Sequence, residues 1–204
     1  MKKRLLPIPL ILLIPIVLLV IVAVAGIYRF SLSDEEIMAK FPATKVKSDL
    51  ILKEVFDIPT SNPWTIRVPE SNAFAFMKKH EREKGFVSGP FDDGVVRGEV
   101  IVETKWLTQI APTVFSAPML VSNQGSGIFY YLAIFEYDIT RKRMILSDVA
   151  LIGDRIKVTT LDYKDNRLTL MVMRHGEQQA MAEEPNVAEQ FEFDLSQQYK
   201  LKPL

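Results

Sequence analysis

His175 and Glu177 are the residues whose types and spacing first suggest chemistry, since an imidazole near a carboxylate can transfer protons. A hydrolytic site also needs a nucleophile and a group that orients the histidine, and this spacing identifies neither. A hydrolase that uses His175 is therefore the least favoured of three functional hypotheses. Because the chain carries no catalytic signature, we predict that the protein is not an enzyme.

Metal ligation has equally little support in the sequence. The two histidines, His80 and His175, are separated by 95 residues and belong to no H-E-x-x-H motif, so a zinc site is not expected. Asp92-Asp93-Gly94 and Glu183-Glu184 lack the regular ligand spacing of a calcium loop. We predict neither a metal nor a cofactor. His80 lies in a run of mixed charge and is expected on a solvated surface.

Two glycine-containing segments invite a binding role. Asn123-Gln124-Gly125-Ser126-Gly127 has no P-loop lysine and no following helix, so a turn is favoured over a phosphate cradle. Gly153-Asp154-Arg155 lies between two predicted strands, where Asp and Gly are common turn residues. An Asp154–Arg155 pair fixed in a groove would instead bind a polar ligand, although the turn is favoured.

Aromatic residues supply the remaining candidates. Tyr130 and Tyr131, with Phe129 and Trp106, are able to line a binding groove, but aromatic residues in strands lie more often in the core. The candidate binding residues are, in all, Asp154, Arg155, His175, Tyr130 and Tyr131. The sequence does not tell whether Asp154, Arg155 and His175 share one cleft.

The elements that must position these residues are mainly strands. Ile128 to Phe135 is a continuous apolar run of strand length, which predicts a central strand buried on both faces. Arg143 to Ile152 is expected to pair with it across a turn at Asp138–Lys142. Lys164-Asp165-Asn166 predicts a hairpin between two further strands. The other expected strands are 95–107, 113–122, 155–163, 167–173 and 191–195, and residues 176–187 are expected to form a loop.

The part of the chain before residue 90 has more varied signals. Leu50 to Phe56 and Trp64 to Val68 are predicted as short strands between prolines. Ser71 is predicted to cap a helix over about 72–84, with Gly85 at its end. The predicted fold is α+β, mostly an antiparallel β meander that curls toward a half-barrel, with one or two short helices, over residues 43–204.

The segment Leu5 to Ile27 predicts where this domain resides. Seventeen of its 23 residues are Leu, Ile or Val, and 23 helical residues span roughly 35 Å, more than a hydrocarbon core of about 30 Å. The basic residues 2–4 precede it, so we expect residues 1–4 in the cytoplasm and a single-pass anchor. A capping pattern at Ser33 predicts a short spacer helix within 28–42.

The predicted location is the inner (cytoplasmic) membrane, with the C-terminal domain in the periplasm or outside the cell. A cleaved signal peptide is the alternative, because Ala23-Val24-Ala25 has the form of a cleavage site before Gly26. Against cleavage, the apolar run before this site is longer than signal peptides usually have. Either outcome exports the domain.

Charge and cysteine content exclude several classes of protein. All 25 acidic residues follow residue 29, whereas four of the 25 basic residues lie at or before it, so the exported part has a formal net charge of −4. No basic stretch is interleaved with aromatic residues, and a nucleic-acid partner is not expected. The chain contains no cysteine, which excludes disulfides, thiolate metal sites and a lipidated N-terminal cysteine.

Three motifs in the second half of the chain resemble those of a known family. Residues 125–133 (GSGIFYYLA), 151–158 (LIGDRIKV) and His175-Gly176 occur in that order. This part, about 120–195, resembles the LppP/LprE-like lipoproteins, exported and uncharacterised bacterial proteins. The family commonly has a Cys-Cys-Pro turn after a Met, whereas Met181 here precedes Ala-Glu-Glu-Pro, and the lipidated cysteine is also missing. The resemblance implies export and a membrane tether, but no activity.

Three hypotheses follow for the function. The leading one is a non-catalytic, membrane-anchored domain that binds the bilayer through residues 5–27 and another envelope component, protein or glycan, through its folded part. The alternative is a domain that binds a small molecule, a lipid or a sugar, in a pocket of the curled sheet. The hydrolase with His175 is the third.

Overall fold

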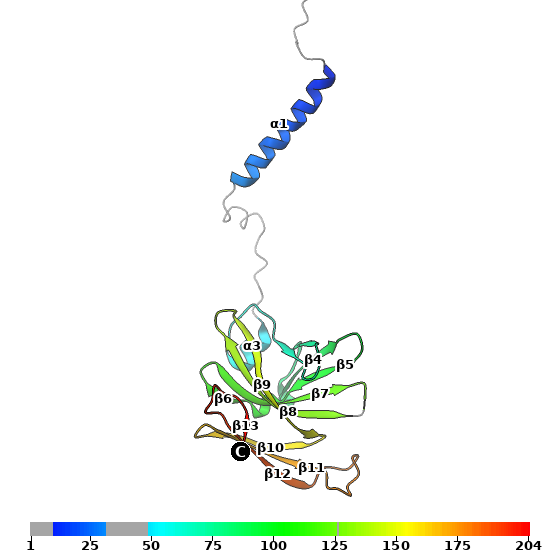
Figure 1. Ribbon diagram of the computed structural model, residues 1–204, viewed down its shortest axis with the longest axis vertical. Coiled ribbons are helices and arrows are strands. Elements are labelled where there is room, and N and C mark those ends of the chain that lie inside the picture. The colour runs from blue at the N-terminus through cyan, green and yellow to red at the C-terminus, as the bar shows by residue number, and fades with distance from the viewer. Residues whose placement is uncertain (1–9, 32–48, 126) are drawn as a thin grey trace, which may run out of the picture. The chain divides into compact units, whose positions relative to one another are not determined.

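The structure is a computed structural model that describes residues 10–31, 49–125 and 127–204. Contacts within the chain divide it into two units, Met1–Val46 and Lys47–Leu204, which are described separately below (Figure 1). The spacer helix predicted near Ser33 lies mostly outside the described residues.

The first unit contains helix α1 (Leu10–Ser31), with Pro15 inside it. Large apolar side chains are exposed at successive positions from Ile16 to Val22, so they lie on every side of the helix. Among the described residues, however, no helix is both long enough and apolar enough to cross a membrane. The described part of the chain therefore does not support the predicted transmembrane helix over residues 5–27, whose first five residues lie outside it.

The second unit is built on a seven-stranded antiparallel sheet. Its strands are ordered β3-β4-β5-β7-β8-β9, and β6 also pairs with β7. Their bounds are β3 (Lys79–Glu81), β4 (Phe86–Asp92), β5 (Arg97–Val102), β6 (Thr108–Ala111), β7 (Val114–Asn123), β8 (Ile128–Asp138) and β9 (Arg143–Asp154). A 3₁₀ turn, η2 (Thr104–Trp106), connects β5 to β6.

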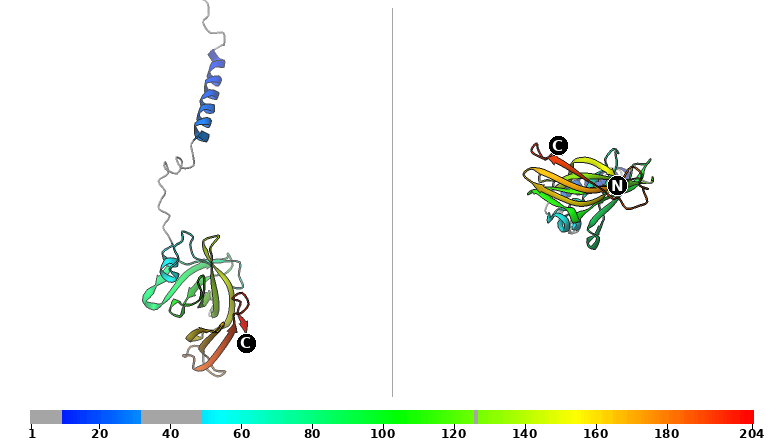
Figure 2. Two further views of the ribbon diagram at one scale, coloured as in Figure 1. Left: turned by 90° about the vertical axis from the view of Figure 1, so that its left-hand side faces the viewer. Right: turned by 90° about the horizontal axis from the view of Figure 1, so that it is seen from below.

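Two smaller sheets cover the seven-stranded one. The four-stranded sheet consists of β10 (Lys157–Lys164), β11 (Arg167–Arg174), β12 (Val187–Asp194) and β13 (Lys202–Pro203), in that order. The hairpin of β1 (Thr65–Arg67) and β2 (Phe74–Phe76) forms the third sheet. Figures 1 and 2 show strands β10 to β12, coloured from gold to orange, as a layer separate from the green and yellow strands of the large sheet.

Strand β8 explains why the unit has two hydrophobic cores. Ala133 and Phe135 face a core shared with β1, β2 and helix α3 (Leu50–Phe56). Leu132 and Ile134 face a second core, shared with β10, β11 and β12. All four side chains are fully buried, as the apolar run predicts. The prediction of a strand buried on both faces is confirmed.

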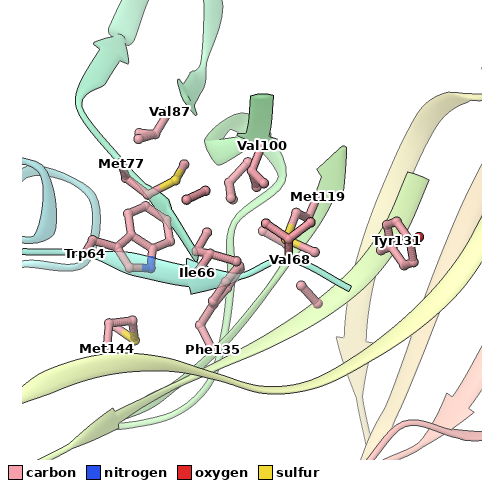
Figure 3. Close-up of a cluster of buried hydrophobic side chains, with 14 of the residues drawn as sticks. Trp64, Ile66, Val68, Met77, Val87, Val100, Met119, Tyr131, Phe135 and Met144 are labelled. Atoms are coloured by element: carbon pink, nitrogen blue, oxygen red, sulfur yellow. The ribbon is translucent and has the colours of Figure 1, made fainter. Parts of the chain in front are cut away.

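The first core fills the concave side of the curled sheet. Trp64 stands edge-on to Phe56 and Phe135, with ring centroids 5.0 and 5.4 Å apart. Ile66 and Met144 complete the centre of this cluster (Figure 3). Irregularities in the β8–β9 register, at Tyr130/Tyr131 and Ile134/Phe135, coincide with the curl of the sheet. The predicted β-rich antiparallel half-barrel with short helices is therefore confirmed.

The prediction of a strand over Leu50–Phe56 is wrong, because this segment forms helix α3. Oδ1 of Asp49 accepts hydrogen bonds from the backbone N–H of Ile51 (2.8 Å) and Leu52 (3.1 Å), which is an N-cap. Leu52 and Phe56, four residues apart, are the buried side chains of the helix. The β-branched residues of this segment favour a strand, but the four-residue spacing of its two buried side chains is that of a helix with one face in the core.

The predicted helix over 72–84 is also wrong. Side chains from Phe74 to Met77 alternate between exposed and buried, as a strand requires, and the segment forms β2, β3 and a 3₁₀ turn, η1 (Arg82–Lys84). The hydroxyl of Ser71 accepts from Ala73 N two residues on, which is a turn rather than a helix cap. Gly85 does end η1, with φ of 68°.

Candidate functional site

Tyr130 and Tyr131 do not share a surface, because consecutive residues of β8 point to opposite faces. Tyr131 is 7% exposed in the first core, and burial is the main cause that raises its pKa, with the negative charge of Glu70 as a second cause. Tyr130 packs against the second core, where burial, and then Glu103, raise its pKa to about 12. Both tyrosines serve mainly as core residues.

Asp154 and Arg155 form the corner where the chain passes from β9 to β10. Oδ1 of Asp154 accepts from Ile128 N at 2.8 Å, and Arg155 N donates to Ile128 O at 2.9 Å. Arg155 adopts a left-handed conformation, with φ of 49°. Through these two bonds, the residues hold this corner at the start of β8. This agrees with the turn that the sequence favours at Gly153-Asp154-Arg155.

His175 directly follows β11 and belongs to a loop that bonds to itself. Its Nε2 lies 2.9 Å from the backbone oxygen of Glu183. Gln179 accepts from Gly176 N at 3.1 Å and donates to the backbone oxygen of Glu184. This network orders the loop that the sequence predicts over 176–187.

Asp154 and His175 meet in a cleft of about 220 Å³ between the β9–β10 corner and the end of β11. An ion pair between Arg174 Nε and Glu189 Oε2 (3.2 Å) lies in its wall. The lining residues are Ile152, Gly153, Asp154, Ile156, Arg174, His175, Met181 and Glu189. Arg155, although adjacent to Asp154, is not among them. Among the described residues that line the cleft, no side chain carries a hydroxyl or thiol, so the hydrolase hypothesis gains no serine, threonine or cysteine nucleophile there.

Asp92 and Asp93, which were considered as calcium ligands, are engaged in other contacts. Asp93 accepts from Val95 N and Val96 N in the β4–β5 turn, and these bonds lower its pKa. Asp92 pairs with Arg97, with 2.7 Å between Oδ2 and Nε. Within residues 10–31, 49–125 and 127–204, no group of three or more His, Asp or Glu side chains is arranged to hold a metal ion.

His80 is not the surface residue that the sequence suggests. Its side chain is 13% exposed, and its Nδ1 lies 2.8 Å from Oε2 of Glu54 on α3. Arg82 pairs with the same carboxylate. Hydrogen bonds from His80 and then Arg82 lower the pKa of Glu54. The three residues join α3 to β3 and η1, which is a structural role.

A groove of about 430 Å³ lies between the β1–β2 connection and strand β9. Its walls are apolar at Val68, Pro69, Leu146 and Val149. Polar and charged groups complete the lining: Arg67, Glu70, Ser71, Asn72, Ser147 and Asp148. The sequence does not predict this groove, because no motif or spacing relates residues 67–72 to residues 146–149. Glu70, with φ of 58°, holds the β1–β2 connection in a left-handed turn at its edge.

Comparison with known proteins assigns no family. No family of known proteins, no curated protein and no solved structure matches this chain significantly. The resemblance of residues 120–195 to the LppP/LprE-like lipoproteins accordingly stays a prediction.

Proposed function

We propose that this protein is a membrane-tethered domain on the outer side of the cytoplasmic membrane, which binds another envelope component without catalysing a reaction. The observation that carries the proposal is the groove between the β1–β2 connection and β9. Its volume of about 430 Å³ falls within the range of about 300–1,000 Å³ that is usual for binding sites.

The tether is argued from the sequence and from the surface of α1. The run Leu5–Ile27 has no charged residue, and exposed apolar side chains at successive positions from Ile16 to Val22 leave this part of α1 without a polar face. A helix that is apolar all round requires an apolar environment on every side, which a bilayer supplies. The basic residues 2–4 keep the N-terminus in the cytoplasm. In the lipoproteins that residues 120–195 resemble, an attached lipid serves as the membrane tether, which is the role proposed here for Leu5–Ile27.

A reporter fused after Leu204 tests the location. We expect alkaline phosphatase, which is active only after export, to be active in this fusion, and the full-length chain to stay with membranes in carbonate. The proposed location would be refuted if the alkaline phosphatase fusion were inactive while a cytoplasmic reporter fused at the same position was active. Extraction of the full-length chain by carbonate would refute it as well.

The groove has the mixed chemistry of a recognition surface. Arg67 and Asn72 offer hydrogen-bond donors on the wall formed by the β1–β2 connection. On the β9 wall, Leu146 and Val149 are apolar, and the carboxylate of Asp148 accepts from Leu201 N at 2.7 Å. A partner that presents both polar and apolar groups, such as a protein segment or a glycan, matches this lining better than a purely apolar ligand.

Site-specific crosslinking in intact membranes tests the role of the groove. A photo-crosslinking residue at Asn72, which is exposed in the groove, should yield one reproducible adduct. The same residue at Gln178, exposed in the 176–187 loop, is the control and should yield none. Equal adducts at both positions, or none at Asn72, would contradict binding in the groove.

The alternative is binding of a small lipid or sugar. The concave side of the curled sheet is filled by the aromatic cluster around Trp64, which argues against a ligand inside the curl. The groove is large enough for such a ligand, and its apolar and polar walls favour a sugar over a lipid tail. A crosslinked adduct at Asn72 that contains glycan but no protein would favour this alternative.

A further inference from the structure

Strand β9 is the last strand of the large sheet, and its backbone is unpaired on the side that faces away from β8. It pairs with β8 alone, in antiparallel orientation (Figure 1). In such a pair, alternate residues direct their N–H and C=O groups away from the neighbouring strand. Among the described residues, the only group outside β8 that bonds to the backbone of β9 is Nζ of Lys200, at the carbonyl oxygen of Ser147.

The other strands at sheet edges are shorter or more highly charged than β9. Strands β1, β2 and β3 have three residues each, β6 has four and β13 has two, and the eight residues of β10 include three charged ones. Between its two end residues, β9 carries a single charge, Asp148, whose carboxylate accepts from Leu201 N at 2.7 Å. Short or charged edges resist pairing with another chain, whereas a long apolar edge favours it.

Two register irregularities limit the part of this edge that another strand can match to Asp148–Leu151. Ser147 and Ile152 have no register partner on β8, whereas the four residues between them pair in order with residues 134 to 131. The first two of the four also line the groove of about 430 Å³, so the groove borders this stretch. An added strand of four residues would extend over about 13 Å.

The side chains around this stretch indicate what kind of segment fits. Val149 and Leu151 pair with residues of β8 that belong to the first core, so both lie on the concave face, and Leu151 is 56% exposed there. On the opposite wall of the groove, Arg67 and Glu70 are exposed, and neither forms an ion pair with a described residue. A segment with apolar residues at alternate positions and charges of both signs complements these groups.

We propose that the β9 edge at Asp148–Leu151 binds an extended segment of a partner protein, which pairs with β9 as a further strand of the large sheet. The inference rests on the proposed function and specifies its partner as a protein. The edge presents N–H donors and C=O acceptors at the spacing of a peptide backbone, which an extended peptide matches and a glycan does not.

Amide exchange of the full chain in detergent micelles tests whether the edge is open. Val149 and Ala150 are neighbours in the regular stretch, so one amide donates to β8 and the other points outward. The outward amide should exchange at least about tenfold faster. Leu132 and Ala133 of β8, which has a strand on both sides, should show no such alternation. Equal exchange rates at Val149 and Ala150 would overturn the proposal.

A photo-crosslinking residue at Leu151, introduced into the full chain in intact membranes, tests for the partner. It should capture the same protein as the crosslinker at Asn72 in the groove, and protease should digest both adducts to peptide-sized remnants. The crosslinker at Met171, an exposed apolar side chain on the central strand β11, is the control and should capture nothing.

The pattern of adducts separates this inference from the proposed function. An adduct at Asn72 without one at Leu151, or a protease-resistant glycan adduct at Leu151, would overturn strand addition and leave binding in the groove intact. An adduct at Leu151 alone would support strand addition and contradict binding in the groove. Adducts at neither position would overturn both.

Val149→Pro and Ala150→Pro form a matched pair that tests the backbone directly. A proline at the faster-exchanging amide removes the outward donor, which an edge strand tolerates, and should reduce the Asn72 adduct about tenfold or more at unchanged urea stability. The other proline removes a bond to β8 and should lower the stability. A stable edge variant with full adduct yield would overturn the proposal.

Exchange in the purified Asn72 adduct keeps the test decisive if neither proline variant folds. The outward amide of Val149 or Ala150 should then slow by about tenfold or more relative to the free chain, because the added strand accepts its proton in a hydrogen bond. An unchanged rate in the adduct would overturn strand addition.

Discussion

Nδ1 of His80 lies 2.8 Å from Oε2 of Glu54, which ties strand β3 to helix α3. The two residues are 26 positions apart, and each belongs to a short element at the margin of the large sheet. Arg82 binds the same carboxylate. This cluster therefore fixes α3 against the sheet through charged groups, next to the apolar contacts of Leu52 and Phe56.

Acid should weaken this attachment. The pKa of Glu54 is lowered from 4.5 by its hydrogen bonds to His80 and then Arg82. A carboxylate with a depressed folded-state pKa contributes stability that is complete above pH 4.5 and is lost as the pH falls through the lower folded value. We expect Glu54→Gln to be less stable than the wild type above pH 4.5 and to lose less stability below it. Urea unfolding from pH 3 to pH 7 measures this, with the exposed Glu177→Gln as control.

Loss of the cap of α3 should destabilise the domain measurably. Asp49 accepts from Ile51 N, Leu52 N and, through Oδ2, from Trp64 N at 3.0 Å. Asp49→Ala removes all three bonds and should lower the free energy of unfolding by about 2 kcal/mol. Asp49→Asn keeps one acceptor oxygen and should cost clearly less. Equal losses in the two variants, measured by urea unfolding, would contradict this role of the carboxylate.

Removal of a central aromatic ring should have the largest effect. Phe135 is fully buried, with its ring centroid 5.4 Å from Trp64 and 6.4 Å from Phe56. Phe135→Ala should lower the free energy of unfolding by about 3–5 kcal/mol through lost burial and the cavity left behind. Phe76→Ala, at a side chain 48% exposed on β2, should cost less than about 1 kcal/mol. Calorimetry or urea unfolding compares the pair.

The β10–β11 hairpin should be sensitive to the residue type in its turn. Asp165 and Asn166 have φ of 52° and 60°, the left-handed conformation of a two-residue turn. Asp165→Gly fits this conformation and should leave stability unchanged or slightly raised. Asp165→Val should cost about 1–2 kcal/mol, because a β-branched residue is strained there. If the glycine and valine variants unfolded at the same urea concentration, the turn would not have this conformation.

The strands of the second half were predictable because their pairing is local. The hairpin around Asp165 and the β8–β9 pair join neighbours in the chain, so alternation and turn residues suffice. Residues 50–56 were mispredicted because contacts far apart in the chain decide their structure, since Leu52 and Phe56 pack on the large sheet. Residues 72–84 form local pairs instead, β2 with β1 and β3 with β4, and the alternation of side chains from Phe74 to Met77 is the signal that indicates a strand.

The binding surfaces were predictable only in part. The turn residue Asp154 and the histidine at the end of β11 stood out by type, and the structure brings them to one cleft. Tyr130 and Tyr131 stood out as well, but adjacent strand residues face opposite ways. The larger groove depends on the approach of the β1–β2 connection to β9, which requires the complete sheet.

Strand β8 belongs to both cores, with Ala133 and Phe135 on one face and Leu132 and Ile134 on the other. Neither layer can detach without exposing one side of the same four residues to water. Opening of the domain should accordingly be a single cooperative event rather than a stepwise peeling of layers. In deuterium exchange, the amides of Leu132 to Phe135 should then be among the slowest in the molecule, and they should exchange at the rate set by global unfolding.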